Sequence, residues 1–315
     1  MIALPAFKLM RPATLAEAAR LAVEPEARLI AGGTGLLPNL RLGIGAPHTL
    51  VSLDGLAELK NLEISASGIR IGAGVTLDRI SRQEELPAAL REAARSVAAP
   101  GHRSAATLGG NLCLDTRCVY YNQSEHWRRS NDYCLKHGGD ICHVAPQGKK
   151  CRAAYCADLA PALLALGAQV ETTSGSTPLE NLYSDDGAKH LNLGVGEIVS
   201  AVRIPVRNAR SGYAKARGRG AIDYPLAGVA MVLDMKNGRI AGLRVALTGT
   251  NSRPFVLTGT ESLVGSKPDG AALMKLVQKQ AGPVRTTVTA ADYRRQAAAI
   301  LARRLLVRLS KGELS

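Results

Sequence analysis

Apolar and polar positions near the start of the chain follow a pattern that predicts a small strand–helix–strand unit. Apolar residues recur at helical spacing over Thr14–Val23, and the first residue of this stretch forms a capping-box pattern with Glu17. Short apolar runs at Leu29–Ile30 and His48–Leu53 predict strands, and Leu36–Leu42 between them predicts a short helix. We therefore expect strands and helices to alternate at this end of the chain.

The middle of the chain continues this alternation of strand and helix patterns. Helical spacing over Leu86–Ala98 stops at Pro100-Gly101, a dipeptide that breaks helices, and Leu159–Leu166 predicts a second helix. The other elements expected here are a helix at Leu77–Ser81 and strands at Ile69–Gly74, Ala168–Thr172 and Glu197–Pro205. The pattern changes near Arg207–Ser211, where we expect a domain boundary.

The last third of the chain has strand patterns first and helical patterns afterwards. Ala227–Met235 and Arg239–Gly249 are β-like, and Asn237-Gly238 between them is the strongest short signal of a β-hairpin. Helical spacing then covers roughly Asp269–Gln280 and Thr289–Leu309. Strands followed by helices predict an α+β fold rather than a doubly wound parallel sheet.

The composition is that of an ordinary globular protein. Of 315 residues, 46% are hydrophobic and 21% are charged, which is typical of a chain of two or three domains with a buried core. The longest nearly apolar run, Leu159–Val170, is about half of the roughly 20 residues that span a bilayer. Met1–Ala22 lacks the pattern of a signal peptide, so we expect a cytoplasmic protein with no membrane contact.

The net charge of +14 favours an acidic partner, either a redox protein or another subunit. Nucleic acid is a third class of acidic partner. The lysines and arginines are spread along the chain, however, and the one dense stretch, Arg294–Lys311, has apolar residues at helical spacing. We therefore expect no binding to nucleic acid.

Two glycine-rich segments are candidates for binding a phosphate group. Ala31–Gly35 follows a predicted strand and precedes a predicted helix, and its glycines let backbone N–H groups approach an anion closely. The spacing is neither Gly-x-Gly-x-x-Gly nor that of a P-loop, which disfavours both of those sites. A plain tight turn is the alternative for this segment alone. Thr107–Asn111 is a second glycine loop, and the two together favour a cofactor with a diphosphate.

All six cysteines lie between Cys113 and Cys156, and no two of them form a Cys-x-x-Cys pair. A single cysteine is usually a small buried apolar residue. Six in one segment of an intracellular chain favour a metal site over disulfides. Thiolates suit zinc and iron–sulfur clusters alike, and His126, His137 and His143 could complete a zinc site. The spacing alone leaves the metal open.

Three stretches and two single residues together resemble the FAD-binding subunits of the xanthine dehydrogenase and carbon monoxide dehydrogenase superfamily. They are Ala31–Gly35, Thr107–Asn111, the run Ala157–Ala168, and Lys215 with Asp223. The resemblance spans essentially the whole chain and implies an α+β fold. It combines an FAD-binding domain of the vanillyl-alcohol oxidase (PCMH) type, in two subdomains, with a C-terminal domain like that of carbon monoxide dehydrogenase flavoproteins, a small antiparallel sheet with helices.

The same resemblance implies the residues that contact FAD. They are Leu29, Ile30, Ala31, Gly32, Gly33, Thr34, Gly35, Leu36, Val97, Thr107, Leu108, Gly109, Gly110, Asn111, Asp158 and Lys215. Asp158 would contact the flavin and not act as a general base, so no catalytic residue is expected on this chain. A helix N-cap is a second role open to Asp158. The implied domains are residues 1–55 and 56–207, which bind FAD, and residues 208–315, the C-terminal α+β domain.

One departure from the superfamily is decisive. Most members join the equivalents of Asn111 and Asp158 by a short loop, where this chain has an insert at about residues 112–157. Such an insert resembles that of 4-hydroxybenzoyl-CoA reductase β subunits, which carries an additional [4Fe–4S] cluster. The stretches that match are Gly109–Cys118, Tyr121–Glu125, Tyr133–Lys136 and Cys142–Val144. This resemblance implies four ligands and two bystanders: the ligands are Cys118, Cys134, Cys142 and Cys151, and the bystanders are Cys113 and Cys156.

The function implied by this resemblance is electron transfer within a larger molybdenum enzyme. A molybdenum-cofactor subunit and a [2Fe–2S] subunit would complete a heterotrimer, and two heterotrimers would form a dimer. Electrons would pass from reduced ferredoxin through [4Fe–4S] and FAD to the [2Fe–2S] and molybdenum subunits, for reductive dehydroxylation to benzoyl-CoA. Two alternatives stay open. One is the FAD subunit of another molybdenum hydroxylase, with zinc or no metal in the insert, and the other is a zinc-stabilised basic protein that binds nucleic acid.

Overall fold

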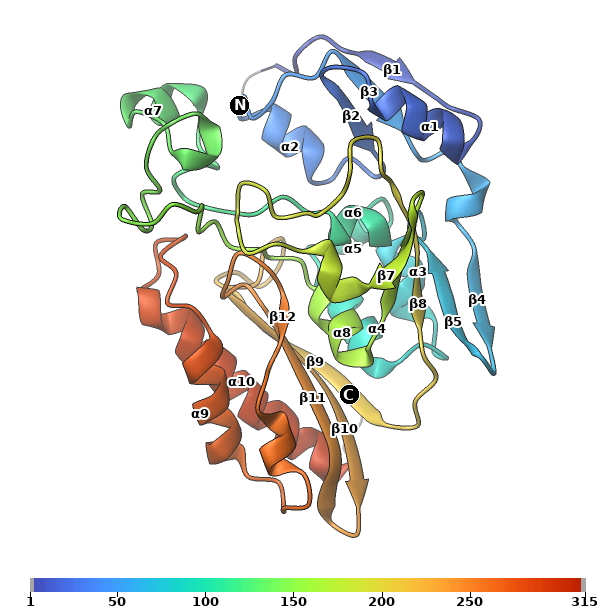
Figure 1. Cartoon of the computed structure of the whole chain (residues 1–315), viewed down its shortest axis with the longest axis vertical. Coiled ribbons are helices and arrows are strands. Elements are labelled where there is room, and N and C mark those ends of the chain that lie inside the picture. Colours follow the sequence, from blue (N-terminus) through green and yellow to red (C-terminus); the bar gives the residue numbers. More distant parts are fainter. Residues whose placement is uncertain (1–2, 313–315) are drawn as a thin grey trace.

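The computed structural model describes residues 3–312, which form three β-sheets with helices packed between and around them (Figure 1). The N-terminal sheet is parallel and has the order β1-β3-β2. Its elements and the two helices beside it are β1 (Lys8–Met10), α1 (Leu15–Ala22), β2 (Ala27–Ile30), α2 (Leu36–Leu40) and β3 (Thr49–Ser52). The strand–helix alternation predicted for this end of the chain is confirmed.

The predicted cap of α1 is confirmed in one half only. The N–H of Glu17 donates to the hydroxyl of Thr14 at 3.2 Å, as the capping-box pattern requires. The carboxylate of Glu17 accepts from the N–H of Ala13 at 2.8 Å, one residue before the position in the standard box. The helix still begins at the predicted place because one of its free N–H groups is satisfied by the hydroxyl.

The second sheet is antiparallel and has the order β4-β5-β8-β6-β7. Its strands are β4 (Leu62–Ser65), β5 (Gly68–Gly72), β6 (Gln169–Thr172), β7 (Gly175–Pro178) and β8 (Val199–Ile204). The three inner strands were predicted from their apolar runs. The two edge strands were not, because their residues are largely polar and exposed and leave no apolar pattern.

The C-terminal sheet is a four-stranded antiparallel sheet with the order β12-β11-β10-β9. Its elements are β9 (Arg210–Ala216), β10 (Ala227–Lys236), β11 (Arg239–Thr248), β12 (Phe255–Val256), α9 (Gly270–Gln280) and α10 (Ala291–Lys311). The predicted hairpin is present, and both turn residues have positive φ, 52° at Asn237 and 72° at Gly238. An Asn-Gly pair takes up this conformation easily, and it matches the twist of the two strands.

The C-terminal sheet has helices on both faces, which joins the two halves of the chain (Figure 1). The helices on its inner side, α4 (Ala88–Ser96) and α8 (Leu159–Leu166), belong to the first half of the chain, and α3 (Leu77–Arg82) packs against α4. Along β10, Val229 and Met231 pack in the core formed with α9 and α10, whereas Ala230 and Val232 pack in the core that contains α4 and α8. Because β10 is buried on both faces, its sequence is continuously apolar instead of alternating.

The segment from Pro100 to the start of α8 has short helices and little regular structure. Its helices are α5 (Pro100–Arg103), α6 (Leu108–Leu112), α7 (Glu125–Ser130) and a 3₁₀ turn at Leu135–His137. Other 3₁₀ turns are Ala57–Leu59, Leu179–Leu182 and Thr260–Leu263. The prediction of a glycine loop at Thr107–Asn111 was wrong, because this segment is helix α6 with the Thr107 hydroxyl as its N-cap. None of the helices within residues 3–312 is long and apolar enough to cross a membrane.

Candidate cofactor sites

The first glycine segment is a true loop between β2 and α2. Among the residues that the structure describes, none accepts a hydrogen bond from the N–H groups of Gly32, Gly33, Thr34 or Gly35. Gly33 has φ of +69°, a conformation in which neighbouring N–H groups turn toward one side. A run of unpaired N–H groups at such a turn can hold the oxygens of a phosphate group.

This loop packs tightly against the segment that leads into α6. A Cβ atom at Gly32 would lie 1.9 Å from the carbonyl oxygen of Ala105 and 3.0 Å from the nitrogen of Ala106. No side chain fits in that space, so glycine is required for the two backbones to approach each other. The structure therefore brings the two predicted FAD-binding segments side by side.

Helix α6 uses its own N–H groups differently from the first glycine loop. Leu108 and Gly109 donate to the carbonyl oxygens of Val75 and Ala73 at 2.9 and 2.8 Å, just beyond strand β5. A Cβ at Gly109 would lie 2.8 Å from the side chain of Ala73, so this glycine also permits close packing. The backbone at the start of α6 is thus occupied by protein contacts, and the unpaired N–H groups belong to the first loop.

The side chain of Asn111 links α6 to α8. Its Oδ1 atom accepts from the N–H of Leu159 at 3.1 Å and satisfies one of the free donors at the start of α8. Asp158 occupies the N-cap position of this helix, but its side chain makes no capping hydrogen bond. The capping role considered for Asp158 was therefore wrong, because Asn111 supplies the oxygen and leaves the carboxylate free for other partners.

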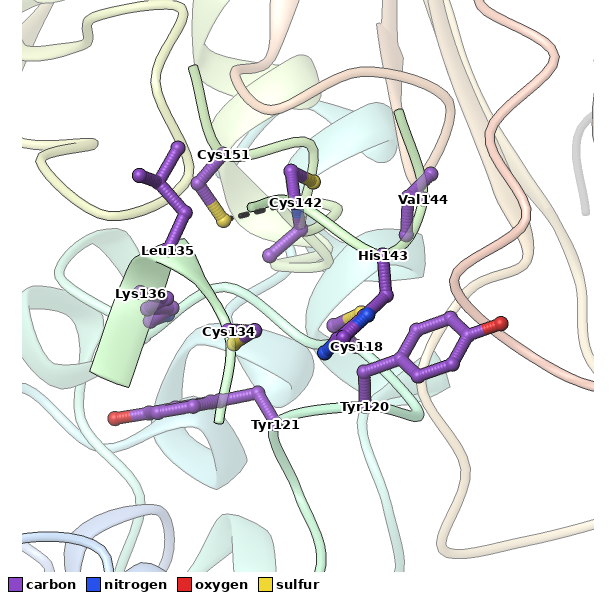
Figure 2. A pocket seen from close by; sticks show the side chains of 11 residues that line it. Cys118, Tyr120, Tyr121, Cys134, Leu135, Lys136, Cys142, His143, Val144 and Cys151 are labelled. Atoms are coloured by element: carbon purple, nitrogen blue, oxygen red, sulfur yellow. Dashed lines mark hydrogen bonds between the residues drawn. The ribbon is translucent and has the colours of Figure 1, made fainter. Parts of the chain in front are cut away.

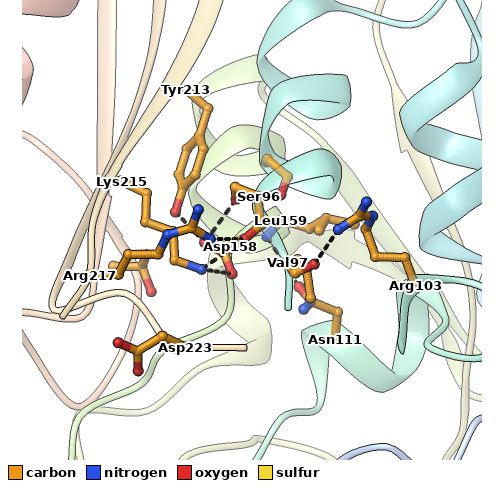
Figure 3. A network of polar contacts seen from close by, with 12 residues as sticks. Ser96, Val97, Arg103, Asn111, Asp158, Leu159, Tyr213, Lys215, Arg217 and Asp223 are labelled. Carbon is orange, nitrogen blue, oxygen red and sulfur yellow. Dashed lines mark hydrogen bonds and ion pairs between the residues drawn. The ribbon is translucent and has the colours of Figure 1, made fainter. Parts of the chain in front are cut away.

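Those partners form a buried polar network between the two halves of the chain (Figure 3). Lys215 on β9 donates from Nζ to Oδ2 of Asp158 at 3.1 Å, and the two side chains are only 5% and 4% exposed. The hydroxyls of Tyr213 and Ser96 donate to Oδ1 of Asp158 at 2.6 and 3.2 Å. Lys215 also reaches the carbonyl oxygen of Ser96 at 3.1 Å. Two residues predicted as FAD contacts, Asp158 and Lys215, are thus each other's ion-pair partners.

Burial and ion pairing shift the pKa of the carboxylate in this network in opposite directions. Burial raises the pKa of Asp158, while the ammonium of Lys215 and the hydroxyls of Tyr213 and Ser96 act in the opposite direction. The pKa of Tyr213 lies well above its ordinary value, because of burial and then because of the adjacent carboxylate. Tyr213 therefore stays a hydroxyl donor, and the network fixes a lysine and a carboxylate in one place without a free acid or base.

Val97, which was predicted to contact FAD, and Asp223 lie near this network (Figure 3). Val97 is half-buried, and its carbonyl oxygen accepts from the guanidinium of Arg103 at 2.9 Å (Figure 3). Asp223, which was grouped with Lys215 on resemblance, instead accepts from the N–H groups of Gly218 and Arg219 at 2.9 and 3.0 Å. Asp223 thus braces the glycine-rich turn after β9.

A second candidate site lies in the insert, where four cysteines line one pocket (Figure 2). They are Cys118, Cys134, Cys142 and Cys151, all of them buried. The other two cysteines lie outside this pocket, Cys113 against the core beneath α6 and Cys156 beside Asp158. Burial raises the pKa of Cys113 to about 12, so that side chain is a neutral thiol.

Backbone N–H groups are directed at the sulfur atoms of the pocket. The N–H of Arg152 lies 3.4 Å from Sγ of Cys142, and the N–H of Ala153 lies 3.4 Å from Sγ of Cys151. The thiol of Cys151 and the N–H groups of Arg152, Ala145 and Val144 lower the pKa of Cys142 to about 5. The hydrogen bond with Cys142 and burial raise the pKa of Cys151, and burial raises the pKa of Cys118 to about 11. The pocket therefore has donors placed to stabilise thiolate sulfur, as metal–thiolate sites require.

The arrangement does not form a site for a single metal ion. Within residues 3–312, no group of three or more His, Cys, Asp and Glu side chains is placed to hold one. Of the three histidines considered as zinc ligands, only His143 lines the pocket, and its Nε2 atom is already hydrogen-bonded to the carbonyl oxygen of Tyr133. His126 is exposed, and His137 packs against Tyr133. The structure thus contradicts a Cys/His zinc site that uses His126 and His137.

A buried arginine that the sequence did not indicate attaches the insert to the rest of the chain. Arg128 on α7 is 1% exposed and donates to the carbonyl oxygens of Leu42 at 3.2 Å and Gly43 at 2.8 Å, just after α2. Ile44, the next residue, packs in the same apolar cluster as Cys118. The segment that follows the first glycine loop therefore packs against the insert in the apolar cluster that holds Cys118, Cys134 and Cys151.

We expect Arg128→Met to loosen this attachment and lower the free energy of unfolding by about 1–3 kcal/mol, because carbonyl oxygens lose their donor. Limited proteolysis should then cut faster inside the insert. Arg129→Met is the matched control. The Arg129 side chain is 72% exposed, and its ion pair with Glu125, which also pairs with Arg128, is long at 3.8 Å. Equal resistance of the two variants would count against the anchoring role.

Comparisons with known proteins agree with this architecture. Residues 5–207 match the family described as "FAD binding domain in molybdopterin dehydrogenase". Residues 211–309 match the "CO dehydrogenase flavoprotein C-terminal domain". The chain therefore belongs to the FAD-binding family of the molybdopterin dehydrogenases, and the predicted α+β fold with these two kinds of domain is confirmed.

Individual relatives show how far the likeness extends. The aldehyde oxidoreductase FAD-binding subunit PaoB of Escherichia coli is 32% identical, over 82% of this chain and 85% of its own. The carbon monoxide dehydrogenase medium chain of Afipia carboxidovorans is 27% identical, over 96% of each chain. The crystal structure of the Cu,Mo-CO dehydrogenase in its cyanide-inactivated form superposes with a TM-score of 0.79 at 24% identity, covering 98% of this chain and 99% of that one. At that identity the superposition establishes the fold alone.

Proposed function

We propose that this chain is the electron-transfer subunit of a molybdenum-containing enzyme of the 4-hydroxybenzoyl-CoA reductase type, with one FAD and one [4Fe–4S] cluster. The observation that carries the proposal is the cysteine pocket. Four buried thiols from an insert of about 45 residues line one pocket, and the two other cysteines lie outside it. The apolar cluster that holds three of these cysteines also contains Ile44, which lies a few residues after the loop that we assign to FAD.

The FAD part of the proposal rests on family membership and on the geometry of the first glycine loop. The unpaired N–H groups from Gly32 to Gly35 would hold the diphosphate. The residues at the start of α6 would shape the site through their side chains and close packing. Asp158 and Lys215 would face the flavin as a fixed ion pair, with Val97 beside them.

The cluster part rests on the chemistry of the pocket. A [4Fe–4S] cluster usually takes four cysteine thiolates, one for each iron. Ligands of a single zinc ion must converge within Zn–S bonds of about 2.3 Å, whereas a cluster holds its thiolates farther apart. The four cysteines share a pocket without converging on one point, and N–H groups approach their sulfurs. This donor set fits a cluster better than zinc.

When bound, the cluster would supply one-electron transfer at low potential, and FAD would connect it to the other centres of the enzyme. The reductant would be a ferredoxin, and the reaction would remove the para hydroxyl group from 4-hydroxybenzoyl-CoA on another subunit. Relatives named as medium chains and as FAD-binding subunits support assembly with further subunits, which would carry molybdenum and [2Fe–2S] centres. The net charge of +14 suits an acidic electron donor.

Analysis of iron and acid-labile sulfide in the anaerobically purified protein tests the cluster. We expect about four of each per chain. Cys134→Ser should remove most of the iron, while FAD stays bound. It should also remove the cluster's absorption shoulder, at about 400 nm in the visible spectrum, which dithionite bleaches in the wild type. Cys113→Ser is the matched control and should keep both, because Cys113 lies outside the pocket.

Other outcomes distinguish the alternatives. Zinc in place of iron would contradict the reductase proposal. It would support the alternative of an FAD subunit of another molybdenum hydroxylase with zinc in the insert. A protein without flavin would contradict the FAD part of the proposal. Turnover of 4-hydroxybenzoyl-CoA with reduced ferredoxin by the assembled enzyme would then test the substrate.

A further inference from the structure

Lys136 is a buried cation in the wall of the cysteine pocket. It lies between Cys134 and Cys142 in the sequence, lines the pocket with them, and has a side chain that is only 5% exposed (Figure 2). No other lysine or arginine side chain lines the pocket among the residues that the structure describes. The positive charge closest to the four sulfurs in this wall is therefore that of Lys136.

The ammonium group of Lys136 is held in place from several directions. Its Nζ atom lies 2.5 Å from Oδ1 of Asp115, 2.5 Å from the hydroxyl of Thr116 and 3.2 Å from the carbonyl oxygen of Thr116. These contacts use all three of its donors. The ring of Tyr121 covers a further side, with its centroid 4.4 Å from Nζ.

The support beneath the ammonium is itself fixed. Thr116 is fully buried, and its hydroxyl also donates to the carbonyl oxygen of Gly187 at 2.5 Å. Asp115 and Thr116 lie three and four residues after the end of α6, so the charge is anchored to the segment that follows this helix. Its position is thus set by groups outside the stretch that contains Cys134 and Cys142.

Stability alone gives little reason for a charge at this place. A buried ion pair costs desolvation energy, and apolar residues of similar size are often as stable or more stable. A fixed positive charge has a definite effect on a redox centre, however, because uptake of one electron adds one negative charge to the four-thiolate site. A cation beside the sulfurs favours the reduced form.

We propose that the charge of Lys136 raises the reduction potential of the cluster, and that its ion-pair partner Asp115 opposes this effect. This inference rests on the proposed function, because it requires the cluster in the cysteine pocket. Asp115 is 31% exposed, so solvent screens its charge more than that of Lys136. The electrostatic potential that the Lys136–Asp115 pair produces in the pocket is therefore positive.

The test is a redox titration of the purified enzyme with dithionite, in which the electron paramagnetic resonance signal of the reduced cluster is measured at each potential. Lys136→Met should shift the midpoint potential to more negative values, since the cation is gone and Asp115 is left unpaired. Asp115→Asn should shift it to more positive values. Lys136→Arg should stay near the wild type. Lys149→Met, on an exposed residue just before Cys151 in sequence, is the matched control and should shift the potential less than Lys136→Met.

Opposite shifts separate an electrostatic role from a structural one, because a merely loosened pocket would move both variants in the same direction. Shifts of one sign, or no shift in either variant, would overturn the proposal. If Lys136→Met cannot hold iron, Asp115→Asn decides alone by the presence or absence of a positive shift. If the wild-type protein contained no iron and no sulfide, that result would instead contradict the proposed function itself.

Discussion

Lys215→Met is expected to lower the free energy of unfolding by about 3–5 kcal/mol, the usual effect of leaving one charge of a buried pair without its partner. Asp158 would remain in a site that is only 4% exposed, with two hydroxyl donors and no cation. The loss should be visible in urea unfolding followed by circular dichroism. Flavin fluorescence in the same experiment should show earlier release of FAD, because both residues lie at the proposed flavin site.

Two variants make this expectation specific. Lys236→Met removes a lysine from the exposed end of β10 and should change stability by less than about 0.5 kcal/mol. The double variant Lys215→Met, Asp158→Asn removes both charges and should recover part of the loss. If Lys215→Met were as stable as Lys236→Met, the buried pair would not couple the two halves of the chain.

Gly32→Ala is expected to weaken FAD binding by roughly 5- to 150-fold, which corresponds to about 1–3 kcal/mol of overpacking. The new methyl group would lie 1.9 Å from a backbone oxygen, that of Ala105, which cannot rotate away as a side chain can. The loop and the segment before α6 must therefore separate. The separation would displace the unpaired N–H groups from the diphosphate.

Gly101→Ala is the matched control for this substitution. A Cβ at Gly101 would have no atom within 4 Å, and the residue is exposed on short helix α5 near the same segment. Fluorescence titration of the flavin-free chains with FAD compares the two variants directly. FAD affinity in Gly32→Ala equal to that in Gly101→Ala would show that the close approach of the two backbones does not serve the cofactor.

Local patterns predicted most of the buried elements correctly. The hairpin at Asn237-Gly238 could be predicted because the turn chemistry and the flanking apolar strands lie next to each other in the sequence. Edge strands β4 and β7 could not, because a strand paired on one side needs no apolar pattern. Helix α6 was mistaken for a loop because glycine has low helix propensity, and its helical form depends on acceptors near residues 73–75 that are distant in sequence.

The candidate sites show the same division. The four cysteines were named from a family resemblance, and the structure places them in one pocket. The role of Asp158 as a helix cap was mispredicted because the oxygen came from Asn111, which precedes it by the length of the insert. Arg128 could not be found at all, since its acceptors lie after α2 and no motif marks them.

The two ends of the insert lie side by side. Arg117 and Ala154 exchange backbone hydrogen bonds of 2.7 and 2.9 Å as an isolated antiparallel bridge, so the chain leaves and returns at one point. The helices on either side, α6 and α8, keep their mutual contact through Asn111 whatever the length between them. A segment that leaves and returns at one point can be gained in a single event, without any rearrangement of the framework on either side of it.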